Sequence, residues 1–135
     1  MSTAKERPAR GEHFFSQLDM RDVEVDGVDL AMELATAPNL TNARGALQGG
    51  LIATLIDIVA GRVALQGLPS AESVATSDLT IHYLAPVLDG PAQARATVLR
   101  RGSRSVVVSV EVYDVAADRL AAVSTIAFAV LRPRS

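Results

Sequence analysis

Residues 45–65 have the sequence GALQGGLIATLIDIVAGRVAL. The pair Gly49-Gly50, followed by a long apolar run without proline, predicts a tight turn that leads into a helix. The run is apolar on nearly every side, which is typical of a helix buried beneath a sheet. One face of this helix carries bulky aliphatic side chains, and the opposite face carries small residues around a single carboxylate, Asp57.

Asp57 has no basic residue one helical turn away, and Arg62 points to another side of the helix. An isolated buried charge is costly, so this carboxylate needs water, another segment, another chain or a ligand as its partner. A carboxylate among apolar residues is a candidate general base or nucleophile. A structural role for Asp57, in which its carboxylate bonds a loop or faces solvent, agrees with the sequence equally well.

The composition is that of an ordinary globular protein. Of the 135 residues, 49% are hydrophobic and 21% are charged, and the formal net charge is −2. The length suits one domain, and the net charge argues against nucleic acid or an anionic membrane as a partner. The chain has no cysteine, which excludes a disulfide framework and a thiol nucleophile. Because His13 and His82 are far apart in the sequence, we expect no metal centre.

The N-terminal residues and one long apolar window indicate where in the cell the protein is expected. Residues 1–12 are polar, so we expect a flexible leader. No secretory pattern is visible, which favours a cytoplasmic protein. The window from Gly49 to Leu68 is long enough to cross a bilayer, but Asp57 and Arg62 near its centre argue against a membrane span.

Segments on both sides of the helix alternate between polar and apolar residues, as strands do. Residues 13–20 predict a short helical turn whose apolar side chains cover an edge of the domain. The dipeptide Asp26-Gly27 between alternating segments predicts a hairpin of strands 21–25 and 28–35. After the helix we expect four more strands, at 74–84, 92–100, 105–113 and 119–131. Strands joined by short turns pair antiparallel, so we expect one α+β domain over residues 13–135.

With this order of elements the chain resembles the hotdog-fold thioesterases, in particular the PaaI-like acyl-CoA thioesterases, in which an antiparallel sheet wraps one long helix. The resemblance covers residues 14–132. The family has an Asn, a His-Gly-Gly after it and an Asp further on, and here these positions are Asn42, Gln48-Gly49-Gly50 and Asp57. Two further segments resemble the family, namely the strand ending in Tyr83-Leu84-Ala85-Pro86 and the turn Arg101-Gly102-Ser103-Arg104.

The resemblance implies a role for each catalytic position. The backbone N–H of Gly49 would polarise a thioester carbonyl, because free N–H groups at a helix N-terminus favour developing negative charge. Asp57, reaching in from a partner subunit, would activate water or attack the carbonyl directly. Asn42 would position the water or the Asp, and Thr76 would place a hydroxyl near the attacking water.

The resemblance also implies substrate contacts and an assembly. Gly50 would contact the substrate, and the arginines of the Arg-Gly-Ser-Arg turn would hold the phosphates of CoA, where otherwise they form a solvated turn. The implied contact residues are Gly50, Arg101, Gly102, Ser103 and Arg104. CoA is part of the substrate, so no separate cofactor is expected. The small-residue face around Asp57 and the open strand edges predict a homodimer and, from it, a homotetramer.

One position departs from the family pattern, because Gln48 stands where the family has His. Gln donates and accepts hydrogen bonds but carries no proton near neutral pH. Hydrolysis of an acyl-CoA is the main expectation, and non-catalytic binding of an acyl-CoA, as a sensor or carrier, is the alternative that Gln48 keeps open. Hydratase or dehydratase chemistry usually needs a His paired with an acid, and neither His13 nor His82 stands at a matching place.

Overall fold

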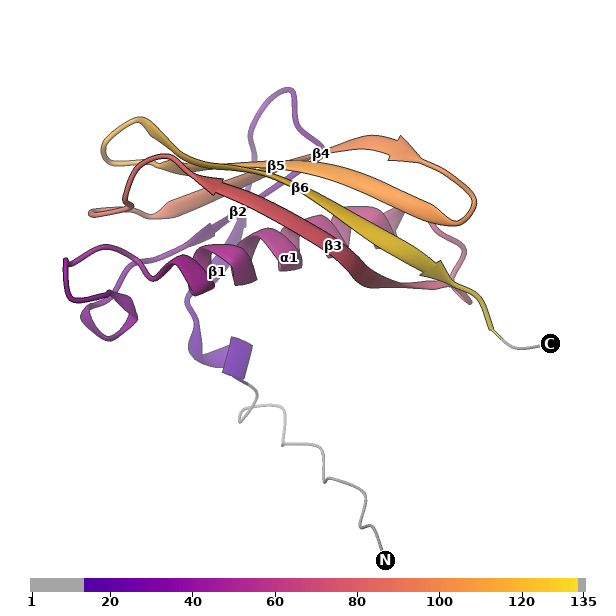
Figure 1. The fold of residues 1–135 in the computed structure, drawn as a ribbon, viewed down its shortest axis with the longest axis horizontal. Coiled ribbons are helices and arrows are strands. Elements are labelled where there is room, and N and C mark those ends of the chain that lie inside the picture. The colour runs from indigo at the N-terminus through magenta and orange to yellow at the C-terminus, as the bar shows by residue number, and fades with distance from the viewer. Residues whose placement is uncertain (1–13, 134–135) are drawn as a thin grey trace, which may run out of the picture.

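The computed structural model describes residues 14–133, so the expected leader 1–12 lies outside the described residues. A six-stranded antiparallel sheet covers one long helix (Figure 1), which confirms the predicted α+β hotdog arrangement. In chain order the elements are the 3-10 helix η2 (Phe14–Gln17), β1 (Met20–Val23), β2 (Leu30–Leu34), the 3-10 helix η3 (Pro38–Leu40), α1 (Gly49–Gln66), β3 (Ser73–Tyr83), β4 (Ala92–Arg101), β5 (Ser105–Asp114) and β6 (Arg119–Leu131).

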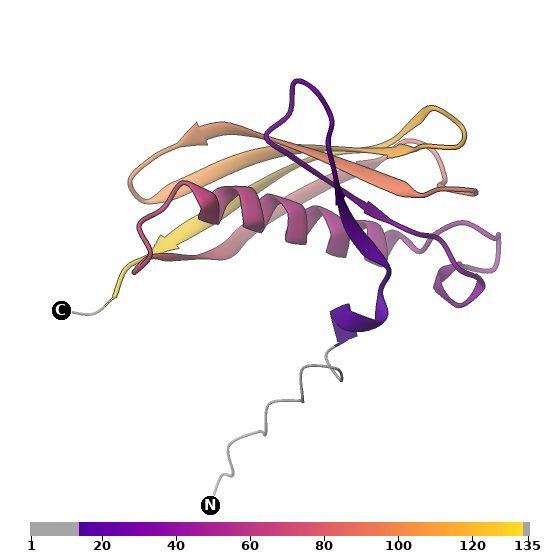
Figure 2. The same cartoon turned by 180° about the vertical axis from the view of Figure 1, so that it is seen from behind.

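The strand order is β1-β2-β4-β5-β6-β3, and every neighbouring pair is antiparallel. The long strand β3 therefore lies at one edge of the sheet and the short strand β1 at the other. Seen from behind in Figure 2, β1 crosses the helix, where Asp22 of β1 bonds Arg62 of α1. The unpaired edge of β3 is the longer of the two and is open to another strand.

The helix α1 begins at Gly49, as predicted, and lies against the concave face of the sheet. It is long and apolar enough to cross a bilayer by length and composition. The sheet that covers it accounts for this apolar character, because seven of its side chains are buried: Ile52, Leu55, Ile56, Val59, Ala60, Val63 and Ala64. Helix geometry places Ala60 and Ala64 among the small residues near Asp57, but both are fully buried and pack against the sheet.

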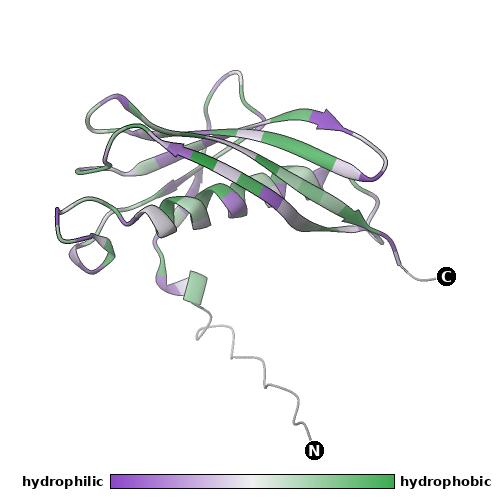
Figure 3. Cartoon of the chain, in the orientation of Figure 1, coloured by the Kyte–Doolittle hydropathy of each residue, from purple (hydrophilic) through white to green (hydrophobic). Residues whose placement is uncertain are grey.

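The core consists of small and β-branched side chains from the strands that cover α1. Every second residue of β5, from Val106 to Val112, is fully buried against the helix. The neighbouring strand β4 presents Ala92, Ala94 and Ala96 to the same core, and these small side chains let the helix approach closely. Figure 3 shows the hydrophobic residues running along both the helix and the strands that pack on it.

The N-terminal part differs from the sequence-based expectation in two ways. The hairpin forms, but its strands are shorter than predicted and residues 24–29 connect them. Just before β2, Asp29 holds this segment to β4, because its N–H bonds Ala96 O and its carboxylate accepts the N–H of Val98. In the turn at residues 14–17 the two phenylalanines, Phe14 and Phe15, are exposed, and the apolar residue that reaches the core is Leu18.

A β-bulge in β3 sets the direction of one predicted site residue. The pairing of β3 with β6 shifts between Thr76 and Asp78, which leaves Ser77 as the extra residue. Strict alternation from Leu79 would turn Thr76 away from the helix. Because of the bulge, Thr76 lies on the helix side of the sheet, where it bonds Asp57.

Candidate active site

The N-terminus of α1 offers two unpaired backbone donors. The carbonyl of Gln48, the N-cap residue, accepts the N–H groups of Leu51 and Ile52 at 3.0 and 3.2 Å. Within the described residues, the N–H groups of Gly49 and Gly50 have no hydrogen-bond partner. Free N–H groups and the positive end of the helix dipole stabilise negative charge on an oxygen placed there.

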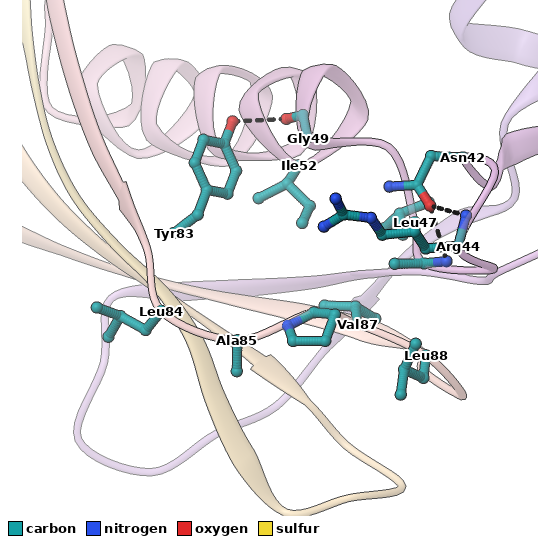
Figure 4. Close-up of a pocket in the computed structure, with 12 residues that line it drawn as sticks. Asn42, Arg44, Leu47, Gly49, Ile52, Tyr83, Leu84, Ala85, Val87 and Leu88 are labelled. Atoms are coloured by element: carbon teal, nitrogen blue, oxygen red, sulfur yellow. Dashed lines mark hydrogen bonds between the residues drawn. The ribbon is translucent and has the colours of Figure 1, made fainter.

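Tyr83, at the end of β3, covers this helix terminus. Its hydroxyl donates to the carbonyl oxygen of Gly49 at 2.7 Å, and its ring stands so close that a Cβ on Gly49 would lie 3.3 Å from its Cζ (Figure 4). Burial raises the pKa of Tyr83, so the phenol keeps its proton at neutral pH and remains a donor. Sequence reasoning placed Tyr83 in a family-like strand ending but gave it no role.

A cavity of about 510 Å³ opens beside Gly49. Its wall is mostly aliphatic, with Arg44, Asn42 and Tyr83 as its polar side chains (Figure 4). The lining residues are Asn42, Arg44, Ala46, Leu47, Gly49, Ile52, Tyr83, Leu84, Ala85, Pro86, Val87 and Leu88. A concave, largely apolar pocket with a few polar groups is the usual form of a small-molecule site.

Asn42 holds the loop that leads into the helix. Its Oδ1 accepts the N–H of Arg44 at 2.9 Å and the N–H of Ala46 at 3.2 Å. The structure places Asn42 in the lining of the Gly49 cavity, and Asn42 does not line the cavity that contains Asp57. In the single protomer, therefore, Asn42 shapes the loop and does not position Asp57.

Asp57 and Thr76, both predicted site residues, lie side by side. The Thr76 hydroxyl donates to Asp57 Oδ1 at 2.7 Å, and both side chains are exposed in the single protomer. They line a second cavity of about 330 Å³ together with Ile58, Gly61, Arg62, Leu65, Val74 and Phe128. Thr76 thus fixes one carboxylate oxygen of Asp57 and leaves the other to act on a substrate or water.

Arg62 lines the same cavity without neutralising Asp57. Its guanidinium bonds both carboxylate oxygens of Asp22, at 2.5 and 2.9 Å. The hydrogen bond between them lowers the pKa of Asp22 and raises the pKa of Arg62. The paired charges hold β1 against the helix, and Asp57 has no cationic partner among the described residues.

The two halves of the predicted site are too far apart to react within one protomer. Gly49 and Asp57 are separated by eight residues on one helix, a distance of about 12 Å along its axis. Reacting atoms must approach to about 3–3.5 Å. A carbonyl bound at Gly49 is therefore beyond the reach of Asp57 from the same chain.

The Arg101–Arg104 turn lies at the opposite end of α1 from Gly49. The guanidinium of Arg101 donates to Ala64 O at 2.8 Å and to Val63 O at 3.1 Å, so it caps the helix C-terminus. The helix has 18 residues, so this end is about 27 Å from Gly49. The turn itself is closed by the Gly102 N–H, which donates to Ser105 O at 2.9 Å, and Ser103 O accepts a bond from Arg132.

Within a single protomer this turn therefore does not line the cavity beside Gly49, and its contact with the CoA phosphates stays a prediction. Arg101 is committed to the helix terminus, whereas Arg104 is exposed and its side chain is in no described ion pair. Among residues 14–133 there is also no cluster of three or more metal-ligating His, Cys, Asp or Glu side chains.

Comparison with known proteins places this architecture in a family. The sequence profile of the thioesterase superfamily matches residues 44–120. SSO2140 of Saccharolobus solfataricus, a suggested esterase, is 31% identical over 105 residues, which are 78% of this chain and 74% of that protein.

Two solved structures share both fold and sequence with the chain. The structure of BH2602 from Bacillus halodurans with CoA has a TM-score of 0.72 and 32% identity, covering 75% of this chain and 66% of that one. The conserved protein PA5202 from Pseudomonas aeruginosa has a TM-score of 0.76 and 31% identity, covering 92% of this chain and all of that one. The hotdog fold, the profile match over more than half of the sequence and these relatives together show that the chain belongs to the thioesterase superfamily.

Proposed function

We propose that the protein is an acyl-CoA thioesterase in which Asp57 acts on a thioester carbonyl held by the Gly49 N–H. The observation that carries this proposal is the open N-terminus of α1 beside a cavity, on the same helix as a carboxylate that has no cationic partner among residues 14–133. Membership of the thioesterase superfamily supports hydrolysis. The CoA part of the substrate is supported by the CoA-containing structure of BH2602.

The chemistry follows from these two groups. Asp57 takes a proton from water as the water oxygen attacks the thioester carbon, and the carbonyl oxygen becomes an oxyanion that accepts the Gly49 N–H. Collapse of this intermediate breaks the carbon–sulfur bond, and the CoA thiolate leaves and takes up a proton. In the nucleophilic variant the carboxylate itself attacks, CoA leaves, and water then cleaves the mixed anhydride. Neither variant needs a cofactor.

The site is completed by a second copy of the chain. Antiparallel pairing of two β3 edges, with Thr80 facing Thr80 of the second copy, sets Asp78 opposite His82. The bulge at Ser77 then shifts the register so that Thr76 faces Tyr83 of the other copy. Thr76 bonds Asp57 and Tyr83 bonds Gly49, so this pairing joins the two halves of the site. We propose a homodimer of this kind, with the tetramer as a further step, in the cytoplasm.

Gln48 lies next to the oxyanion donor and favours a second candidate function. As the N-cap residue it presents its backbone carbonyl to the first turn of the helix, and its side chain makes no capping hydrogen bond. Its amide is free to orient a carbonyl but cannot carry a proton. If the reaction requires a proton carrier at this position, the protein binds an acyl-CoA without cleaving it.

The replacement Asp57→Asn tests the proposed function. It preserves the size and much of the hydrogen bonding of the side chain, so the fold should persist while the base or nucleophile is lost. We expect kcat for acyl-CoA hydrolysis to fall by about 10²–10⁴ with binding retained, because the lost group acts in the chemical step. CoA release over a panel of acyl-CoAs measures this.

The matched control is Asp26→Asn, an exposed aspartate in the connection 24–29, outside both cavities and away from the β3 edge. It should leave kcat unchanged. Equal rates for wild type and Asp57→Asn would remove Asp57 from the mechanism. No turnover by wild type, with acyl-CoA still bound, would favour the binding function.

A further inference from the structure

The cavity beside Gly49 contains one cation and no carboxylate. Of its twelve lining residues, Arg44 is the one that is charged at neutral pH, because the ordinary pKa of tyrosine already lies well above neutral and partial burial raises the pKa of Tyr83 further. The other walls are mainly aliphatic, from Leu47 and Ile52 on one side and Val87 on the other. The cavity is therefore suited to a molecule with an apolar body and a negatively charged group.

The loop is built to hold Arg44 at this place. Asn42 Oδ1 accepts the N–H of Arg44 at 2.9 Å, and the N–H of Gly45 bonds Asn42 O at 3.0 Å. Gly45 has a φ of +79°, a left-handed conformation that favours glycine at this turn. The N–H of Asn42 bonds Ala46 O at 2.8 Å and closes the loop. The backbone on both sides of Arg44 is thus fixed by hydrogen bonds.

The guanidinium of Arg44 is available for a ligand. Figure 4 shows it extending into the cavity between Asn42 and Ile52. The ion pairs among the described residues use Arg21, Arg62 and Arg132, and none uses Arg44. A guanidinium fork with free donors is the group that best matches a carboxylate or a phosphate.

We propose that Arg44 binds a carboxylate at the far end of the acyl group, so that the preferred substrates are CoA thioesters of dicarboxylic acids. This inference rests on the proposed thioesterase function. Arg44 and the Gly49 N–H line the same cavity, which at about 510 Å³ is on the order of 10 Å across. An extended five-carbon chain is about 5 Å long from its thioester carbon to its terminal carboxylate carbon, and a hydrogen bond of about 2.9 Å at each end extends its reach to the order of 10 Å. The phosphates of CoA are separated from the thioester by the whole pantetheine arm, which is longer than the cavity.

Two substrates that differ in one group test this assignment. Glutaryl-CoA and valeryl-CoA have acyl chains of equal length, and glutaryl-CoA has a carboxylate where valeryl-CoA has a methyl group. We expect wild type to favour glutaryl-CoA in kcat/KM. Arg44→Gln should lower kcat/KM for glutaryl-CoA by about tenfold or more and leave valeryl-CoA near wild type, because one charge-assisted contact is lost. Arg44→Lys should restore part of the preference, since it keeps the charge without the fork.

The control is Arg119→Gln, which removes an exposed arginine outside this cavity and should change neither substrate. Equal losses for both substrates in Arg44→Gln would overturn the assignment, because they would show a role in loop structure. A loss confined to the affinity for free CoA would also overturn it and would place Arg44 on a phosphate.

Binding separates this inference from the proposed function. Calorimetric titration of glutaryl-CoA and valeryl-CoA measures the same preference when the protein does not turn over. Preferential binding of glutaryl-CoA by wild type, lost in Arg44→Gln, supports the carboxylate contact even if hydrolysis fails. Equal binding of both thioesters by wild type contradicts it.

Discussion

Tyr83 contacts the N-terminus of α1, where the proposed oxyanion donor lies. Its hydroxyl donates to Gly49 O, and that carbonyl belongs to the peptide group that ends in the Gly50 N–H. A hydrogen bond to the oxygen of a peptide group polarises its N–H, as happens along chains of hydrogen bonds. Tyr83 thus acts as a positioning residue that holds the first peptide groups of α1 and strengthens one of the two free donors.

Tyr83→Phe removes this hydrogen bond and keeps the ring. We expect kcat to fall by about two- to tenfold with KM little changed, because one neutral hydrogen bond contributes about 0.5–1.5 kcal/mol. Steady-state kinetics and thermal unfolding measure activity and stability separately. Tyr113→Phe is the control, since its hydroxyl bonds Glu111 at 3.4 Å away from the site. Equal effects of the two replacements would show that Tyr83 has no special role.

At the level of single residues, the sequence predicts the candidate site residues better than it predicts the contacts between their side chains. Asp57 stands out because no basic residue lies one turn away, and the structure finds its partner to be the Thr76 hydroxyl. The alternation of β3 gave no indication of that bond, because an extra residue at Ser77 reverses the faces of the strand before it. Arg44 and Tyr83 were missed because their importance depends on a cavity that forms between distant segments.

The backbone groups at the two ends of α1 differ in their hydrogen bonding. The N-terminus keeps free N–H groups beside a cavity, whereas the C-terminal carbonyls of Val63 and Ala64 accept the Arg101 guanidinium. A cation at a helix C-terminus offsets the negative end of the dipole. Gly67, the C-cap residue, leaves room for this side chain, since a Cβ there would lie 2.3 Å from Arg101 Cζ.

Comparing Arg101→Ala with Arg104→Ala separates the two explanations of the Arg-Gly-Ser-Arg turn. Arg101→Ala should lower the free energy of unfolding by about 1–2 kcal/mol, because two carbonyl bonds from a charged group are lost. Arg104→Ala should stay within about 0.5 kcal/mol, as exposed replacements usually do. Urea unfolding measures both. A raised KM for acyl-CoA in Arg104→Ala alone would support the phosphate contact, and an unchanged stability in Arg101→Ala would contradict the capping role.

The bounds of elements with a regular spacing of apolar residues were predicted closely from the sequence. The helix and the strands after it lie within a residue or two of the expected bounds, because apolar periodicity and glycine or proline turns mark their ends. The first hairpin was less predictable. The segment between its strands is held to β4 through Asp29, and a contact with a strand so distant in the sequence leaves no local pattern.

The single chain holds the two halves of the proposed site apart. Gly49, whose N–H is the proposed oxyanion donor, and Asp57 line separate cavities on one helix. The open edge of β3 carries Thr76 near one of its ends and Tyr83 at the other. A second copy can therefore join the two halves. The register in which two β3 strands would pair is not specified by the composition or the periodicity of the sequence.

The absence of cysteine makes the proposed β3 pairing directly testable. Thr80→Cys places one thiol at the two-fold axis, where opposed Cα atoms lie about 4.5–5.5 Å apart and a disulfide can form. We expect a covalent dimer under mild oxidation on a non-reducing gel. Thr125→Cys is the matched control, because Thr125 pairs with Thr80 one strand further in, about 14 Å from its own copy. Equal cross-linking of the two variants would contradict the register.

The site shared between two copies is tested most directly by mixing two inactive variants. Asp57→Asn removes the carboxylate, and Gly49→Pro removes the N–H donor. Proline suits the first position of a helix, and Gln48 before it has φ −59° and ψ 135°, which a residue preceding proline adopts readily. Gly49→Ala, which keeps the N–H, controls for the added Cβ next to Tyr83.

After subunit exchange, half of the dimers contain one copy of each variant, and each of these has one intact site out of two. The shared site predicts that acyl-CoA hydrolysis by the mixture returns to about a quarter of the wild-type rate, although each variant alone is inactive. A mixture that exchanges subunits and remains as inactive as its components would contradict a site built from Asp57 of one copy and Gly49 of the other.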